Sequence, residues 1–167
     1  RSPITWVDHT AALYAAFGIM AALFERTTSG RGQQVSANLL GSALACSSTY
    51  LIEQAATQPD RVAIGNRSFV NGPTDTFRTR DGWIVTQVVG PAIFRRWASL
   101  MEEPAWMEDP RFATDELRGR NGALLSARMQ DWCAQRTSTE VLDLLAAANI
   151  PAGPVLSPRE VLEHPQV

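Results

Sequence analysis

The hydrophobic positions of the chain are most densely grouped in Ala11–Phe24, a stretch whose one polar group is the hydroxyl of Tyr14. A helix that is apolar on every side is buried rather than laid on a surface, so this pattern predicts a buried helix. We expect it to run from Asp8 to Ser29, because Gly30 then occupies the C′ position that glycine favours. Asp8 therefore stands at the head of a predicted buried helix.

Asp8 is compatible with two roles. Aspartate is among the best N-cap residues, and its position alone favours that ordinary structural role. A carboxylate at a buried helix N-terminus is also oriented by unpaired backbone N–H groups and kept ionised by the helix dipole. A carboxylate held in this way can act as a nucleophile, so Asp8 is the candidate catalytic residue.

Two further elements are expected before the chain becomes irregular. Gln34–Asn38 alternates between polar and apolar residues, which predicts a short strand. Small and apolar residues from Leu39 to about Thr57 then follow a helical pattern that would allow close helix packing.

Strong helix and strand breakers separate this first part from the rest of the chain. They are Gly65-Asn66 and the run Asn71-Gly72-Pro73. We therefore place a linker there and divide the chain into residues 1–57, a linker at 58–75, and a small domain at 76–167.

The small domain begins with a predicted β-hairpin. Thr76–Arg80 and Trp83–Val89 are separated by Asp81-Gly82, the pair that a tight hairpin turn favours. Helical patterns follow at 91–101, at 115–135, and after capping boxes at Thr137–Glu140 and Ser157–Glu160. Ile150–Leu156 is expected to be extended, and its prolines favour a sheet edge or a loop. The aromatic residues of this domain, Trp83, Phe94, Trp97, Trp106 and Trp132, are expected in its core.

Composition narrows the function classes. The 167 residues suit one ordinary domain or two small ones, and 45% hydrophobic residues allow a packed core. A net charge of −2 favours neither nucleic acid nor an acidic membrane surface as a partner. The apolar run is too short to span a bilayer and no signal peptide is visible, so we expect a cytoplasmic protein that does not enter a membrane.

The cysteines and histidines do not suggest a metal or redox site. Cys46 and Cys133 both lie in helical apolar patterns, which predicts two buried free thiols in a reducing compartment. His9 and His164 are far apart and show no metal-ligand spacing. We therefore expect neither a metal nor a bound redox cofactor.

Several short motifs occur along the chain in a recognisable order. The first group is Asp8, a small and apolar helix, and then Ala21–Arg26 and Ser29–Val35. The second group runs through the small domain as Thr76–Ile84, Phe94, Trp97, Asp109–Phe112, Arg120-Asn121 and Ile150–Val155. Together they resemble the class III CoA-transferase family, which also contains α-methylacyl-CoA racemase; Ser29 replaces the threonine that is usual there.

The resemblance implies that the chain is the middle portion of a longer protein. Residues 1–57 would belong to the family's large nucleotide-fold domain and residues 76–167 to its small α/β domain. The implied fold class is mixed α/β, with a buried catalytic helix and a helical linker followed by that small domain. Family proteins form interlocked dimers, so a homodimer is expected of the full-length protein. The implied partners are an acyl-CoA thioester, as substrate, and a small carboxylic acid.

In the implied reaction, Asp8 attacks the thioester and CoA passes to the acceptor acid through aspartyl anhydride and aspartyl-CoA thioester intermediates. The resemblance also places Gly65, Asn66 and Gly72 in loops over the acyl site, although an ordinary linker accounts for them from the sequence alone. Racemisation of a 2-methylacyl-CoA, with Asp8 as acid or base, remains an alternative. So does an inactive segment that serves only for packing or dimerisation.

Overall fold

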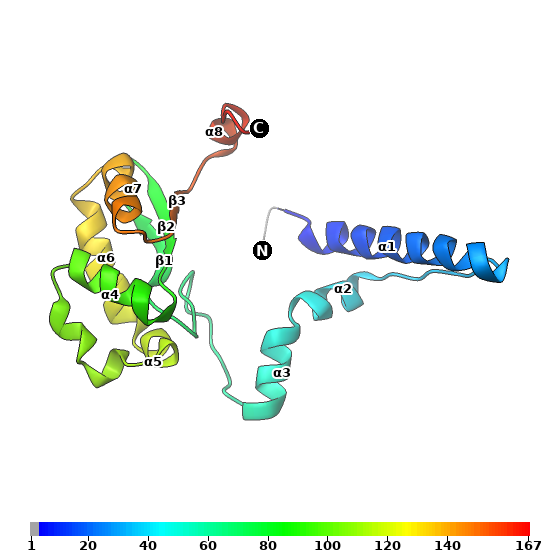
Figure 1. The fold of residues 1–167 in the computed structure, drawn as a ribbon, viewed down its shortest axis with the longest axis horizontal. Coiled ribbons are helices and arrows are strands. Elements are labelled where there is room, and N and C mark those ends of the chain that lie inside the picture. Colours follow the sequence, from blue (N-terminus) through cyan, green and yellow to red (C-terminus); the bar gives the residue numbers. More distant parts are fainter. Residues whose placement is uncertain (1–3) are drawn as a thin grey trace. The chain divides into compact units, whose positions relative to one another are not determined.

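The computed structural model describes residues 4–167 and divides into two compact units, residues 1–62 and 63–167 (Figure 1). The first unit contains α1 (Trp6–Ser29), α2 (Leu39–Cys46) and α3 (Ser48–Thr57). The second contains β1 (Thr74–Arg78), β2 (Trp83–Gln87), α4 (Gly90–Leu100), η1 (Pro104–Met107), η2 (Pro110–Phe112), α5 (Asp115–Arg120), α6 (Gly122–Ala134), α7 (Ser138–Ala147), β3 (Ala152–Pro154) and α8 (Pro158–Leu162). The fold is mixed α/β, as predicted, and the boundary between the units lies within the predicted linker.

The ends of α1 differ in how well the sequence predicted them. Gly30 adopts the left-handed conformation with φ 69°, and its N–H donates to the Arg26 carbonyl, which confirms the C′ prediction. At the other end the N-cap is Thr5, so Asp8 is the third residue of the helix. The interpretation of Asp8 as an N-cap is therefore wrong, because the helix begins two residues earlier than the sequence suggested.

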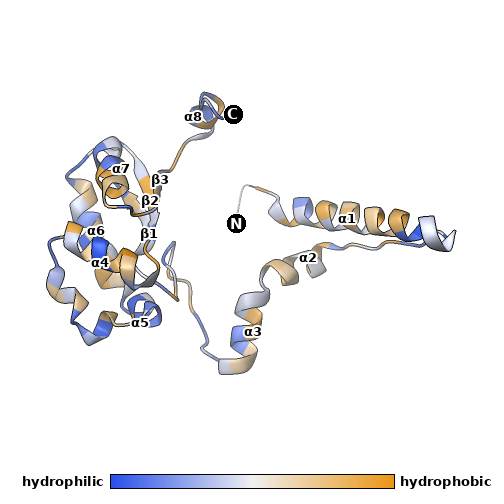
Figure 2. Cartoon of the chain, viewed as in Figure 1, coloured by the Kyte–Doolittle hydropathy of each residue, from blue (hydrophilic) through white to orange (hydrophobic). Residues whose placement is uncertain are grey.

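The prediction that α1 is buried is also wrong for the chain as described. No residue of Trp6–Ser29 is buried, although apolar side chains run along its whole length (Figure 2). One stripe of small residues is partly covered by the returning chain, and a Cβ on Gly18 would lie only 2.7 Å from Cγ1 of Val35. The other faces of α1 require a surface that residues 4–167 do not supply.

The length of α1 corrects a second expectation. Its 24 residues span roughly 36 Å, and its most apolar window has a mean hydropathy of 1.4. By length and composition alone it is long and apolar enough to cross a membrane, so the argument that the apolar run is too short does not hold. A core helix of a soluble protein passes the same test.

The rest of the first unit is less regular than predicted. Residues 34–38 form no strand, because they find no ladder partner within residues 4–62. The helical region breaks at Ser47 into α2 and α3. Cys46 ends α2 and is exposed, which contradicts the prediction of a buried thiol. As for α1, residues 4–167 do not supply a surface that packs against it.

The second unit confirms the predicted hairpin. β1 and β2 pair antiparallel with Phe77 opposite Ile84, and the turn closes where the N–H of Thr79 donates to the Gly82 carbonyl at 3.0 Å. β3 adds to the other side of β2, giving the order β1-β2-β3. The predicted extended segment thus contains an edge strand, which is one of the two outcomes that its prolines favoured.

The core of the second unit lies between this sheet and α4, α6 and α7 (Figure 1). Phe94 and Trp97 stack with ring centroids 5.7 Å apart, and Trp97 is fully buried. Trp83 is 47% exposed, contrary to prediction, because the alternation of β2 turns Ile84 inward and Trp83 outward. Both capping boxes form, whereas the single helix predicted at 115–135 breaks at Asn121.

Candidate functional site

Asp8 lies in the first turn of α1, where its exposed carboxylate is close to the positive end of the helix dipole. The N–H of His9 is the first to bond along the helix, donating to the Thr5 carbonyl at 3.1 Å. The preceding N–H groups, including that of Asp8 itself, have no intrahelical acceptor and point out of the helix end. This helix end can therefore stabilise negative charge on Asp8 or on an oxyanion next to it.

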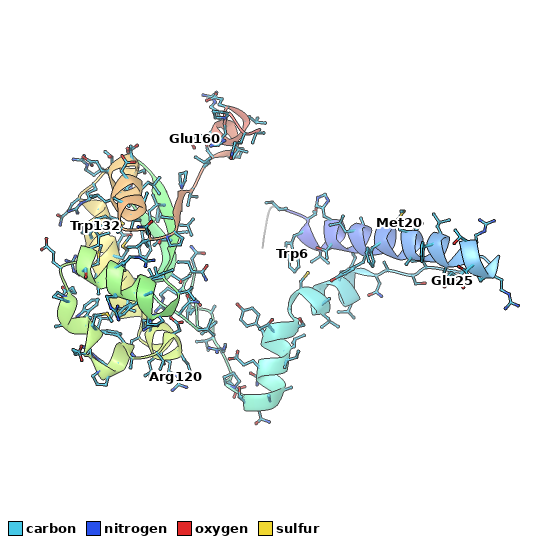
Figure 3. All side chains as sticks on the ribbon, in the orientation of Figure 1. Trp6, Met20, Glu25, Arg120, Trp132 and Glu160 are labelled. Atoms are coloured by element: carbon cyan, nitrogen blue, oxygen red, sulfur yellow. The ribbon has the colours of Figure 1, made fainter. Side chains whose placement is uncertain are left out.

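The surroundings of Asp8 contain few other reactive groups. Within residues 4–167, the carboxylate of Asp8 makes no hydrogen bond or ion pair. His9 follows it on the exposed surface, and Trp6 at the start of α1 is 44% exposed (Figure 3). The hydroxyl of Thr10 is already used, since it donates to the Trp6 carbonyl at 2.7 Å. The described residues therefore leave the carboxylate accessible to a substrate.

The three predicted substrate-binding residues lie in the second unit. Gly65 adopts φ 75°, a conformation that favours glycine, and Asn66 donates from Nδ2 to Oγ1 of Thr76 at 2.8 Å. Gly72 is buried, and a Cβ there would approach the Arg118 carbonyl oxygen to 2.8 Å. The loop of Gly65 and Asn66 is thus exposed and anchored to β1, whereas Gly72 allows close packing of backbone on α5.

A cavity next to this loop was missed from the sequence. It measures about 300 Å³ and is lined by residues from the loop, β1 and α6, among them Arg67, Asp75 and Ser126. Arg67 directly follows Asn66, which is the one sequence signal that could have drawn attention to it. Ser126 lies in the middle of a helical pattern and gave no signal.

The first unit has a second cavity of about 270 Å³, where the turn after α1 folds back on the helix. Arg26 and Gln33 contribute its polar groups, and Ile19 and Val35 are among its apolar ones. Among residues 4–167, no group of three or more His, Cys, Asp or Glu is placed to hold a metal ion.

The ionisable groups with shifted pKa values serve the fold. Asp81 accepts hydrogen bonds from the backbone N–H and the hydroxyl of Ser138, and these bonds lower the pKa of its carboxyl from its ordinary value. They tie the hairpin turn to the N-terminus of α7. Burial raises the pKa of the Cys133 thiol to about 12, so this cysteine is a packing residue rather than a nucleophile.

Comparison with known proteins identifies related sequences over the entire chain. The family model described as CoA-transferase family III matches residues 1–167. A succinyl-CoA–D-citramalate CoA-transferase of Chloroflexus aurantiacus is 32% identical over 166 residues, which cover 99% of this chain and 41% of the relative. A formyl-CoA:oxalate CoA-transferase of Rhodopseudomonas palustris is 26% identical, with 96% and 43% covered. The chain thus spans about two fifths of the length of the curated relatives it matches.

Solved structures are also similar to this chain over nearly its whole length. The crystal structure of a hypothetical protein from Mycobacterium tuberculosis is similar with a TM-score of 0.80 and 27% identity, over 99% of this chain and 43% of that one. A CAIB/BAIF family protein from Brucella suis gives a TM-score of 0.76 and 25% identity, over 99% and 44%.

Proposed function

The chain belongs to CoA-transferase family III, and we propose that the whole protein moves CoA from an acyl-CoA to a carboxylic acid through covalent intermediates on Asp8. The observation that carries the proposal is the place of Asp8, in the first turn of a long apolar helix within a chain that the family model matches from end to end. The curated relatives named above are CoA-transferases with acyl-CoA donors and carboxylic acid acceptors, which favours transfer over racemisation.

The proposed reaction begins with attack by an Oδ atom of Asp8 on the thioester carbonyl carbon. The carbon–sulfur bond breaks, and an aspartyl–acyl anhydride and CoA thiolate result. The thiolate then attacks the Asp8 carbonyl, which releases the donor acid and leaves an aspartyl-CoA thioester. The acceptor carboxylate attacks this thioester to give a second anhydride, and the thiolate finally takes the acceptor acyl group and restores Asp8.

The helix end supplies what this chemistry needs. Each attack forms a tetrahedral oxyanion, and the unpaired N–H groups at the start of α1 are donors of the kind that stabilise one. The 24-residue helix places the positive end of its dipole next to Asp8, where it stabilises developing negative charge at the reacting groups. No step requires a metal or a redox cofactor.

The exposed apolar surface of α1 fits this proposal. We propose that residues 1–57 form part of a larger domain, and that the remainder of the protein and a second subunit cover α1 in a cytoplasmic homodimer. Burying α1 in this way would desolvate Asp8. We further propose that the loop of Gly65 and Asn66 contacts the acyl group, whereas Gly72 acts through packing.

Chemical trapping tests the role of Asp8. We would incubate the whole protein with an acyl-CoA, quench it with hydroxylamine, and measure the mass of the peptide that contains Asp8. The expected product is a hydroxamate on Asp8 that is absent from Asp8→Asn and present in Glu25→Gln, which removes a carboxylate from the far end of the same helix. Loss of a nucleophile of this kind lowers kcat by several orders of magnitude.

The competing functions give different results in the same experiment. An unmodified peptide from protein that exchanges the α-proton of a 2-methylacyl-CoA with deuterated water would indicate a racemase, with Asp8 as acid or base. An unmodified peptide and no exchange would leave only a packing or dimerisation role for this region.

A further inference from the structure

Within residues 4–167, the outer edge of β1 is the longer of the two edges of the three-stranded sheet, with five residues against three at β3. β1 pairs with β2 through the backbone groups of alternate residues, so those of Thr74, Thr76 and Arg78 point away from β2. A row of unpaired backbone groups at a sheet edge is a template for a strand of another chain. β3 is a poorer template, because Pro154 has no N–H to donate.

The side chain of Gln130 occupies both backbone groups at one end of this edge. Gln130 projects from α6, and its Oε1 atom accepts from the Arg78 N–H at 2.9 Å. Its Nε2 atom donates to the Arg78 carbonyl, also at 2.9 Å. The amide group thus offers one acceptor and one donor to Arg78, as the backbone of a neighbouring strand would.

Asp75 occupies a further N–H group of the same edge. Its Oδ1 atom accepts from the Thr76 N–H at 2.9 Å. By the alternation of the strand, Asp75 lies on the same face as the core residue Phe77. A charged residue on the core-facing side of an edge strand disfavours a further strand there, because pairing would surround the charge with protein. The N–H groups of Thr76 and Arg78 are therefore both taken by side chains.

We propose that Gln130 closes the edge of β1 against strand addition by a second copy of this chain. Two copies of β1 present the same row of backbone groups, so they would pair antiparallel about a two-fold axis if those groups were open. The amide of Gln130 removes both groups of Arg78 from such a pairing. All of these residues lie in the second unit, so the closure does not depend on the chemistry at Asp8.

Light scattering of the whole protein over a range of concentrations tests this closure. Gln130→Ala opens both backbone groups of Arg78, so we expect a larger mass than that of the unmodified protein, growing with concentration and reversing on dilution. Gln130→Glu keeps an acceptor for the Arg78 N–H and loses only the donor, so it should associate less than Gln130→Ala. Gln135→Ala is the matched control, because it removes an exposed glutamine side chain that makes no hydrogen bond within residues 4–167.

Hydrogen exchange of single amides identifies the surface that associates. In dilute Gln130→Ala, the Arg78 amide should exchange roughly fivefold faster or more, as expected for the loss of one ordinary hydrogen bond. The amide of Ile84, which faces β1 from the middle strand, should exchange as in the unmodified protein. At concentrations where Gln130→Ala associates, the Arg78 amide should become protected again, because it then pairs with the second copy.

Three results would overturn the proposal. The first is a mass for Gln130→Ala that equals that of the unmodified protein at every concentration. The second is association in which the Arg78 amide stays unprotected, since the copies would then meet at another surface. The third is faster exchange of both the Arg78 and the Ile84 amides in the dilute variant, since Gln130 would then hold the sheet together rather than close its edge.

Discussion

Replacing Gly119 with alanine sets two physical effects against each other. Gly119 lies inside α5, where alanine is favoured over glycine by about 1 kcal/mol. A Cβ at this position would lie 2.3 Å from the carbonyl oxygen of Phe69 and 2.8 Å from the nitrogen of Val70. These are backbone atoms, which cannot rotate away, and overpacking of this kind costs about 1–3 kcal/mol. The upper end of that range less the helix preference leaves a net loss of about 2 kcal/mol.

Thermal unfolding of the 167-residue chain measures the outcome. For a protein of this size, a loss of about 2 kcal/mol lowers Tm by about 4–8 °C. Gly122→Ala is the matched control, because a Cβ there meets no atom within 4 Å. A Tm that rises in Gly119→Ala, as helix propensity alone would have it, would refute the close packing of α5 on the loop that carries Arg67.

Three further predictions concern the second unit. Trp97→Ala should lower the free energy of unfolding by about 3–5 kcal/mol in urea titrations, because a fully buried indole is lost, and a loss under 1 kcal/mol would contradict the described core. The bonds to Ser138 lower the folded-state pKa of Asp81 from its ordinary value, so they stabilise the fold above about pH 4, and this stability is lost as the pH falls through the lowered pKa. The Tm difference between the unmodified chain and Asp81→Asn should accordingly shrink on acidification; a constant difference would exclude this linkage. In the 167-residue chain at pH 8, iodoacetamide should label exposed Cys46 and spare Cys133, whose pKa is about 12, and equal labelling would contradict the burial of Cys133.

Local signals predicted the second unit well. Asp81-Gly82 determines the hairpin, and the capping boxes at Thr137 and Ser157 determine where α7 and α8 begin. Each of these signals acts over a few residues and needs no distant contact. Trp83 was wrongly predicted to lie in the core. The composition of a strand indicates that one of its two faces is buried, but it does not identify which face.

The first unit was predicted less well, because its structure depends on contacts beyond the segment itself. The apolar pattern of α1 predicts a buried helix, but burial requires other parts of a protein to pack against it. Residues 4–167 pack against only one stripe of α1. The same limit applies to the cavity. Arg67 and Ser126 are far apart in the sequence, and only the packing of α6 on β1 brings them to one cavity.

Transfer of a heavy oxygen atom to Asp8 tests the central claim most directly. The whole protein would be given an acyl-CoA and an acceptor acid labelled with ¹⁸O in its carboxylate, and the peptide containing Asp8 would be analysed by mass spectrometry. The second anhydride joins the acceptor to Asp8 through an acceptor oxygen, so Asp8 should carry one ¹⁸O atom after a single turnover. An Asp8 peptide without ¹⁸O, in protein that has formed the new acyl-CoA, would contradict the proposed covalent route.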